Sequence, residues 1–412
     1  MAPQALAIDF GTSNSAAAIL RDGHVQRIAM EADADTLPTA VFFPADGGAM
    51  RIGRAATQAL IAGHEGRYMR ALKSVLGTAL LHETRLIAGR RRSLAQVIAA
   101  FLSELRQRAE QATGLRFHRA LSGRPVHFHS NDPQADLRAE ADLRACYLAA
   151  GFDQVDFLPE PQAAALASHR LGADDSLGLI VDIGGGTSDF SVIRSGRTGV
   201  RILANHGIRL GGTDFDQLLS LSHAMPLLGH GGELRREMGP GLLPMPNGIY
   251  VDLANWARIP FLYAPEPRRM AADMARLAVH PHKLRRLVTV LRDELGHDLA
   301  FAVEHGKIAA NGGEIAHISL DFIEPGLATS LGHETLAATL AGHRQQLQDA
   351  MSQTLQFARV DAADIGHVIL VGGSSLMEMV ASAAHEVCPQ ARLLRSDAFT
   401  AVIDGLAIAT AS

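Results

Sequence analysis

The sequence predicts a duplicated α/β fold with two lobes, and this prediction depends on a repeated motif and on the chain length. The segment LAIDFGTSNS begins at Leu6, and most of its pattern returns from Leu179 as LIVDIGGGTSDFS. Each copy has an apolar run, an aspartate, small flexible residues and then hydroxyl side chains. A chain of 412 residues also exceeds what one compact core usually holds, so two or more domains are expected.

The first copy of the motif predicts a buried hairpin. Apolar runs at residues 5–8 and 16–20 flank the segment GTSN, whose residue types favour turns. The second copy has the same order, with apolar runs at residues 177–181 and 190–193 around GGGTSD. Two such strand-turn-strand units indicate that one half of the fold is repeated.

Helical patterns fill the intervals between these predicted strands. In residues 94–113 apolar side chains recur at helical spacing, and Gly114 follows as a stop. Further helices are predicted at residues 135–150, 160–169, 336–358 and 401–410. The stretch 229–248 contains GHGG, GPG and PMPNG, which predict an irregular segment.

Composition and charge exclude several classes of function. The chain is 47% hydrophobic and 20% charged with a net charge of -5, which favours an ordered protein and gives no reason to expect nucleic acid or an anionic membrane as partner. Two cysteines provide neither a disulfide framework nor a four-cysteine zinc site. The N-terminus has no signal-peptide pattern, and no apolar run is long enough to span a membrane. We therefore expect a soluble cytoplasmic protein.

The histidines do not predict a metal centre. His127 and His129 are expected on one face of a strand, and His280 and His282 flank a proline. Neither pair has third and fourth ligands at a recognisable spacing, so polar or packed histidines are the better interpretation.

The repeated turns predict a phosphate site. Turns rich in Gly, Thr and Ser expose backbone N–H groups that bind phosphate, and residues 184–186 are glycines that an anion can approach closely. Asp9 and Asp182 each end an apolar strand, and two carboxylates facing a polyphosphate need a cation between them. Mg²⁺ fits, because it binds few carboxylates together with water and phosphate oxygens.

Other interpretations of these glycines are weaker. A glycine-rich turn by itself is often only a hairpin connection, and it is the matched pair that favours a nucleotide site. The chain has no G-x-x-x-x-G-K-[ST] segment and no G-x-G-x-x-G that follows a strand and opens a helix. A P-loop ATPase and a Rossmann site are therefore disfavoured.

Five segments in order carry a resemblance to a known family. IDFGTSNS, LPEPQAAALA, VDIGGGTSDFSVI, IRLGGTDFD and VILVGGSS, over about residues 6–405, resemble the ATPase domain of the 70-kDa heat-shock chaperones of the DnaK type. GRPVHF, LPMPNGIY and the early end of the chain resemble the truncated DnaK-related YegD type. The resemblance implies an actin-like (ribonuclease H-like) duplicated fold around a central nucleotide cleft. Lobe I would be residues 1–172, lobe II residues 173–393, and residues 394–412 a helix returning to lobe I.

The resemblance also implies roles for individual residues, with ATP or ADP and Mg²⁺ as cofactors. The implied catalytic residues are Lys73, Glu160, Asp182, Thr187 and Asp189. The implied nucleotide-binding residues are Asp9, Gly11, Thr12, Ser13, Asn14, Gly184, Gly185, Gly186, Gly211, Gly212, Asp214, Glu304, Lys307, Gly372, Gly373 and Ser374. Asp9 and Asp182 would hold Mg²⁺ through water.

Two departures from the family pattern modify this expectation. The family clamps adenine between two arginines, and this chain has Ile308 and Leu376 at those positions. Nucleotide binding is therefore expected to be weaker, with a relaxed base preference. The family also continues into a linker and a peptide-binding domain, which we expect to be lacking here.

The expected function is an ATP-binding, slowly ATP-hydrolysing chaperone-like protein whose lobe closure regulates a protein partner or client. One alternative is a nucleotide-gated binding module with negligible turnover. A small-molecule kinase of the same superfamily is a weaker alternative, because the sequence shows no sugar-binding signature. The oligomeric state is open.

Overall fold

The computed structural model describes residues 5–129, 132–168, 176–196, 199–313, 315–395 and 400–411. It has two compact units, which we call unit 1 (residues 1–212 and 344–412) and unit 2 (residues 213–343). These units do not coincide with the predicted lobes, whose boundaries remain a prediction. Among the described residues, no helix combines the length and the hydropathy that crossing a bilayer requires.

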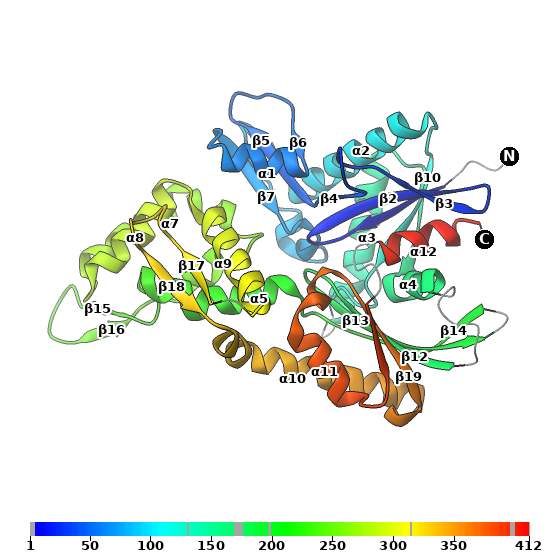
Figure 1. Cartoon of the computed structure of the whole chain (residues 1–412). Helices are drawn as coiled ribbons and strands as arrows, with labels where there is room; N and C mark the ends of the chain where they lie inside the picture. The colour runs from blue at the N-terminus through cyan, green and yellow to red at the C-terminus, as the bar shows by residue number, and fades with distance from the viewer. Residues whose placement is uncertain are drawn as a thin grey trace. The chain divides into compact units, whose positions relative to one another are not determined.

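Two sheets of unit 1 repeat one topology (Figure 1). The first has the strand order β3-β2-β1-β10-β11, with β4 paired to β2, and the second has the order β14-β13-β12-β19-β20. In each sheet three successive strands pair antiparallel, and the first of the three also pairs in parallel with a later strand. The predicted duplication of an α/β half is confirmed.

The bounds of these strands agree with the two predicted hairpins. The strands of the first sheet are β1 (Ala5–Phe10), β2 (Asn14–Arg21), β3 (His24–Ile28), β4 (Thr36–Pro38), β10 (Arg119–Arg124) and β11 (Gln154–Pro159). Those of the second sheet are β12 (Ser176–Ile183), β13 (Ser188–Gly196), β14 (Gly199–Ile208), β19 (Ile365–Val371) and β20 (Arg392–Arg395).

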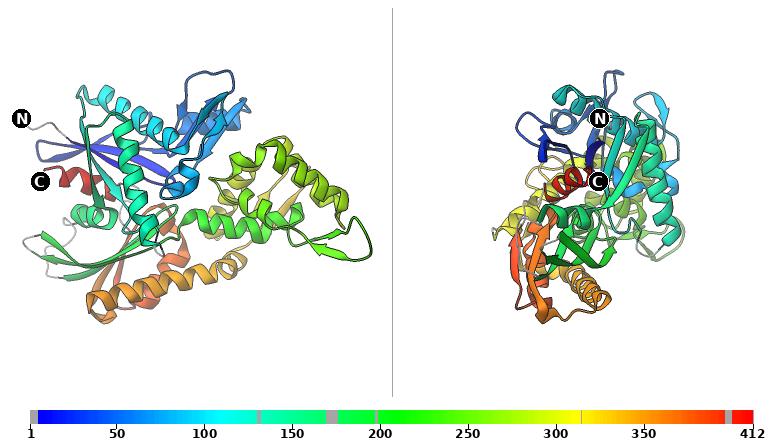
Figure 2. Two further views of the ribbon diagram at one scale, coloured as in Figure 1. Left: turned by 180° about the vertical axis from the view of Figure 1, so that it is seen from behind. Right: turned by 90° about the vertical axis from the view of Figure 1, so that its right-hand side faces the viewer.

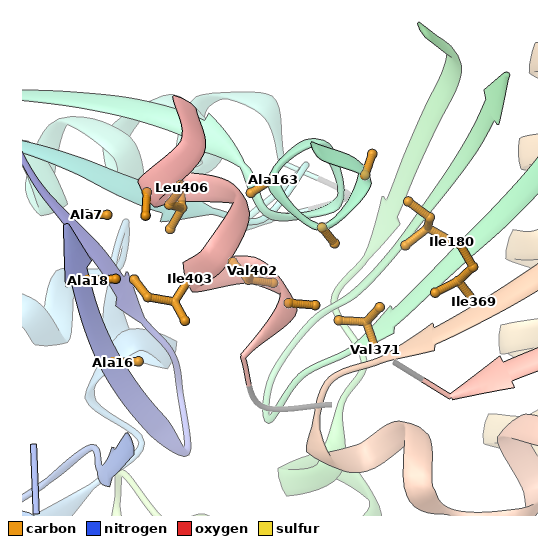
Figure 3. Packing of buried hydrophobic residues seen from close by; sticks show 14 of the residues in the cluster. Ala7, Ala16, Ala18, Ala163, Ile180, Ile369, Val371, Val402, Ile403 and Leu406 are labelled. Carbon is orange, nitrogen blue, oxygen red and sulfur yellow. The ribbon is translucent and has the colours of Figure 1, made fainter. Parts of the chain in front are cut away.

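Two helices lie between the sheets of unit 1, α4 (Glu160–Ser168) and α12 (Ala401–Ala409) (Figure 2). Their small and apolar side chains form one buried cluster with residues of β1, β2, β12 and β19. Figure 3 shows Ile403 and Leu406 of α12 on the side of β1 and β2, with Ile180 and Ile369 on the opposite side of the cluster. The two sheets therefore share a core.

The backbones of α4 and α12 are in direct contact. A Cβ atom added to Gly405 would overlap the carbonyl group of Ala163, so only glycine fits at this crossing. Arg27 of β3 also holds α12, donating from Nε and Nη2 to the carboxylate of Asp404 at 2.7 and 2.6 Å. The helix at the end of the described chain is thereby fixed to the first sheet.

The remaining elements of unit 1 cover the sheets. Helix α2 has the predicted bounds Leu94–Thr113, because Ser93 and Gln96 form a capping box and Gly114 ends the helix in a left-handed conformation (φ 71°). The other helices are α1 (Arg54–Ile61), α3 (Pro133–Ala149), α10 (His333–Ala358, shared with unit 2) and α11 (Glu378–Val387). Short strands are β5 (Ala40–Pro44), β6 (Arg51–Ile52), β7 (Gly66–Arg70), β8 (Arg85–Ile87) and β9 (Arg90–Arg92). The predicted end of α4, His169, lies outside the described residues.

Unit 2 is mainly helical and has two small hairpins. Its helices are α5 (Gly212–Leu219), α6 (Gly248–Leu253), α7 (Pro265–Leu277), α8 (Pro281–Arg292) and α9 (Gly296–Asn311). The hairpins are β15 (Glu233–Arg235) with β16 (Leu242–Pro244), and β17 (Ala316–Ser319) with β18 (Ala328–Leu331). The prediction that residues 229–248 are irregular was wrong for β15 and β16, because the GPG turn between them closes a short antiparallel pair.

Candidate functional site

The two glycine-rich turns of unit 1 are in direct contact. One turn joins β1 to β2 at residues 11–14, and the other joins β12 to β13 at residues 184–187. A Cβ atom on Gly185 would lie 2.5 Å from Ser13 Oγ and 3.0 Å from Thr12 Cβ, and one on Gly186 would lie 3.3 Å from Thr12 Oγ1. Any larger residue at position 185 would separate the turns. The structure thus brings the two predicted phosphate turns together.

Two further glycine segments of unit 1 adjoin the second turn. A Cβ atom on Gly211 would lie 2.5 Å from the backbone nitrogen of Gly186, and the N–H of Gly212 donates to Gly184 O at 3.0 Å. Gly372 follows β19 with φ +81°, and a Cβ atom added to it would lie 2.6 Å from Asp182 Oδ1. Ser374 is packed against Gly212. These predicted binding residues of unit 1 therefore cluster at the carboxyl ends of β1, β12 and β19.

A buried ion pair lies beside the turns. Lys73 Nζ is 2.6 Å from Glu160 Oε1, and the two side chains are only 6% and 12% exposed. Lys73 is in the 3-10 turn Leu72–Val75, which begins after Ala71 in a left-handed conformation (φ 58°). Glu160 is the first residue of α4. Burial lowers the pKa of Lys73, but Glu160 and Asp9 outweigh it, so the pKa is raised and the lysine stays charged.

The carboxylates around this pair outnumber the cations. Burial, followed by Glu160, raises the pKa of Asp9 to about 7. Burial and the neighbouring carboxylates Glu160 and Asp189 raise the pKa of Asp182 well above its usual range. In the apoprotein the ionised forms of Asp9 and Asp182 are therefore disfavoured, first by burial and then by the neighbouring carboxylates. Among the described residues, no three His, Cys, Asp or Glu side chains are arranged to hold a metal ion.

Asp189 is fixed by a contact that the sequence did not predict. Its side chain is buried, and Oδ1 accepts a hydrogen bond from the backbone N–H of Val126 at 2.7 Å. Burial and Glu160 raise the pKa of Asp189 well above its usual range, although the Val126 hydrogen bond lowers it. The expected strand at His127 and His129 was wrong, because β10 ends at Arg124 before Pro125 and the chain turns toward Asp189. No local pattern marks this long-range contact.

A small cavity opens beside Lys73 and both turns. Its volume is about 20 Å³, which is enough for roughly one water molecule. The lining residues are Thr12, Lys73, Ser74, Leu76, Phe128, His129, Gly186, Thr187 and Arg209. His129 donates from Nε2 to Leu76 O at 2.7 Å, and Arg209 donates to Ser74 O at 3.2 Å. Neither residue was predicted at the site, although Arg209 lies inside the quoted segment IRLGGTDFD.

Comparison with known proteins agrees with this geometry. Residues 83–226, which include Glu160, Asp182, Asp189 and the second glycine turn, match the family model described as Hsp70 protein. Over these residues the chain is similar to the Hsp70 family. The fold of unit 1 is the actin-like duplicated α/β fold of that family, as its two matching sheets require.

Several curated relatives of the chain are named as chaperones. The chain is 34% identical over 214 residues to "Chaperone protein DnaK" of Thermosipho melanesiensis, which covers 51% of the chain and 34% of that protein. It is 29% identical over 424 residues to "Chaperone protein HscA homolog" of Burkholderia thailandensis, covering 98% of the chain and 57% of the relative. A DnaK of Endomicrobium trichonymphae is 26% identical over 390 residues, covering 92% and 53%. The chain thus spans about a third to a little over half of these relatives.

The remaining predicted site residues of the chain lie in unit 2. Asp214 is in the first turn of α5, and Glu304 and Lys307 are on α9. Lys307 Nζ is 2.7 Å from Asp216 Oδ1, and both side chains are less than a tenth exposed. Ile308, which replaces a family arginine, is 59% exposed on the same helix.

The raised pKa of Asp9 predicts a pH dependence of stability in the apoprotein. An unfolded aspartate has a pKa near 4, so between about pH 4 and pH 7 the folded chain binds more protons at this site than the unfolded chain. The contribution of Asp9 to the free energy of unfolding is therefore largest below about pH 4 and is lost as the pH rises toward about 7. We expect the unfolding midpoint without nucleotide or Mg²⁺ to fall over that range, and the fall to be smaller in Asp9→Asn. Equal slopes in both proteins would contradict this assignment.

Proposed function

We propose that this chain binds ATP with Mg²⁺ and hydrolyses it slowly, and that its nucleotide state controls a protein partner or client. The contact between the two glycine turns beside the buried Lys73–Glu160 pair carries this proposal. The curated relatives are named as chaperones, which supports a chaperone-like role. A cytoplasmic location is part of the proposal and is supported by two buried free cysteines.

The turns at residues 11–14 and 184–187 would hold the phosphates. Their glycines leave no room for side chains, so backbone N–H groups and the hydroxyls of Thr12, Ser13 and Thr187 are the groups that a phosphate meets. Asn14 begins β2 directly after the first turn. Gly211 and Gly212 pack on the second turn and support its shape.

The buried carboxylates fit Mg²⁺. Asp9 and Asp182 would hold the ion through water, because a divalent cation would offset the burial and the carboxylate repulsion that raise their pKa values in the apoprotein. When bound, Mg²⁺ neutralises charge on the phosphates. The protein's contribution is to hold the two carboxylates at the ends of β1 and β12.

Hydrolysis needs a positioned water and a positive charge close to the γ-phosphate. Lys73 lines the cavity that has space for roughly one water, and Thr187 lines it from the second turn. Glu160 keeps the ammonium of Lys73 charged and fixed, and Asp189 is held by Val126 at the start of β13. We propose that Lys73 and Thr187 orient the attacking water and that Glu160 and Asp189 maintain the local charge.

The resemblance implies that Glu304, Lys307 and the segment Gly372–Ser374 are contacts to the nucleoside. Ile308 and Leu376 lack the cationic stacking of the family arginines, a loss of about 0.5–2 kcal/mol each. We expect the dissociation constant of ADP, measured by calorimetry, to lie above the micromolar range. The variants Ile308→Arg and Leu376→Arg should bind ADP more tightly than the wild-type chain. A submicromolar constant for the wild-type chain would contradict this expectation.

The finer features of the proposal follow the resemblance. Nucleotide-driven closure of lobes at residues 1–172 and 173–393 would regulate a protein partner, and the finer resemblance is to the YegD type. A nucleotide-gated binding module with negligible turnover is the second candidate, because Ile308 and Leu376 are exposed apolar residues at positions where adenine would be clamped. A small-molecule kinase has less support, since LGGTDFD and EPQAAALA match the chaperone branch.

Metal removal tests the proposal directly. We would measure nucleotide binding by calorimetry and phosphate release under single-turnover conditions, first with Mg²⁺ and then with excess EDTA. We expect release above the protein-free rate that stops with EDTA and returns when Mg²⁺ is added. Binding without release would favour the nucleotide-gated module, and the absence of binding would overturn both candidates.

A further inference from the structure

Unit 2 contains a cavity of about 360 Å³ at the start of α8, which we call the α8 cavity. Its lining includes His230, Glu233, Met245, His280, Lys283 and Leu284. The volume is in the range of about 300–1,000 Å³ that is typical of small-molecule sites. None of these residues belongs to the proposed nucleotide site, so an inference from this cavity stands independently of the proposed function.

The wall formed by the segment GHGG is well defined. Gly229 has φ +102°, and a side chain at this position would collide with Leu284 of α8. The ring of His230 packs on Tyr250 with the ring centres 5.2 Å apart. Tyr250 is fully buried and donates its hydroxyl to Leu228 O at 3.2 Å. The imidazole of His230 is therefore held in place at the cavity wall.

The start of α8 forms another part of the lining. The dipole of a helix makes its first turn positive, and this attracts negative charge. Pro281 has no N–H and the N–H of Lys283 donates to His280 O at 3.2 Å, so the attraction comes from the helix dipole and not from free N–H groups of these two residues. His280 is the N-cap residue of α8, and its side chain makes no capping hydrogen bond. All residues of α8 are described in the structure, and its first turn contains no acidic residue. Instead it holds Lys283, which adds positive charge where the helix is already positive. This arrangement is unfavourable for the empty protein and favourable for a bound anion.

The α8 cavity also carries a negative charge and an apolar surface. Glu233 lines it, and no ion pair of the described residues joins Glu233 or Lys283 to another side chain. The buried side chains of Met245 and Leu284 supply apolar area. A simple inorganic anion would satisfy Lys283 but would be repelled by Glu233, whereas a zwitterion satisfies both.

We propose that the α8 cavity binds a free α-amino acid with an apolar side chain. Its carboxylate would meet the ammonium of Lys283 at the positive end of α8, and its ammonium would meet Glu233. Its side chain would contact Met245 and Leu284. His230 and His280 provide ring nitrogens that can complete the hydrogen bonding of either polar group.

The test uses three related probes on the full chain, with binding measured by ligand-observed NMR and calorimetry. L-Leucine is expected to bind, while N-acetyl-L-leucine, which has no ammonium group, and L-leucinamide, which has no carboxylate, are expected to bind at least about tenfold more weakly. Lys283→Gln and Glu233→Gln should each weaken leucine binding about tenfold. Arg285→Gln on α8 and Glu237→Gln after β15 are the matched controls, and both should bind leucine like the wild-type chain.

Stability provides a second measurement that needs no ligand. Lys283→Gln should raise the unfolding midpoint of the empty chain, because it removes a cation from the positive end of α8. Leucine should raise the midpoints of the wild-type chain and the two control variants more than those of Lys283→Gln and Glu233→Gln. The proposal is overturned if leucine does not bind at millimolar concentration or if both variants bind it normally. It is also overturned if acetate or phosphate binds as well as leucine and Glu233→Gln strengthens that binding, which would indicate a site for simple anions.

Discussion

Replacing Lys73 by alanine is expected to reduce phosphate release from Mg–ATP by about 100- to 1000-fold, the range observed when one positioned charge-stabilising group is removed from an active site. The ammonium group of Lys73 lines the small cavity between the turns and is held by Glu160 at 2.6 Å. Alanine removes this charge and leaves the glycine turns in place. We would measure single-turnover phosphate release and, separately, nucleotide affinity by calorimetry, which should change much less than the rate.

Two controls separate a catalytic effect from a structural one. Lys73→Ala leaves the buried carboxylate of Glu160 without its partner, which is itself destabilising. The double variant Lys73→Ala/Glu160→Gln removes that charge, so a double variant as stable as the wild-type chain that fails to release phosphate would show that the loss of activity does not come from unfolding. Arg90→Ala, an exposed cation on β9, should leave turnover unchanged. Equal release by the wild-type chain and Lys73→Ala would show that Lys73 has no catalytic role.

Substituting alanine for Gly405 is expected to lower the free energy of unfolding by about 1–3 kcal/mol, the usual range for overpacking a core. The added methyl group would meet the carbonyl group of Ala163, and a backbone atom cannot move aside as a flexible side chain does. Helices α4 and α12 would have to separate. Because Glu160 is the first residue of α4, the same substitution should also reduce turnover. Denaturant unfolding and single-turnover phosphate release measure the two effects.

The matched control is the same substitution in open space. Gly342 lies inside α10, and no atom lies near the place that its Cβ would occupy, so Gly342→Ala should stabilise the chain by about 0.5–1 kcal/mol through helix propensity. Opposite changes in the two variants would support the close contact between α4 and α12. Similar changes in both would refute it.

Local patterns predicted much of unit 1. The bounds of α2 follow from its apolar periodicity and from the two residues that cap it, Ser93 and Gly114, all of which are short-range signals. The hairpin around residues 11–14 was predicted for the same reason. The sequence also predicted that both turns serve one nucleotide site, because a duplicated motif is a sequence signal, but their direct contact was not predicted.

Tertiary contacts explain what the sequence did not predict. Val126 and Asp189 are far apart in the chain, and the hydrogen bond between them depends on how β10 ends before Pro125. Arg209 lines the small cavity because it follows directly after strand β14. The sequence predicted its neighbours Gly211 and Gly212 as site residues, but not Arg209. The hairpin β15–β16 has strands too short to show an alternating pattern.

The composition of the core shared by the two sheets has a mechanical consequence. Where α4 and α12 cross, the contacting residues are mainly alanine and glycine, including Ala163, Ala164 and Gly405. Surfaces of small residues have shallow ridges and grooves, so they resist separation through close contact but offer little interlocking against sideways displacement. We therefore expect relative movement of the two sheets to occur by shear along this crossing, with α4 carrying Glu160 as it slides.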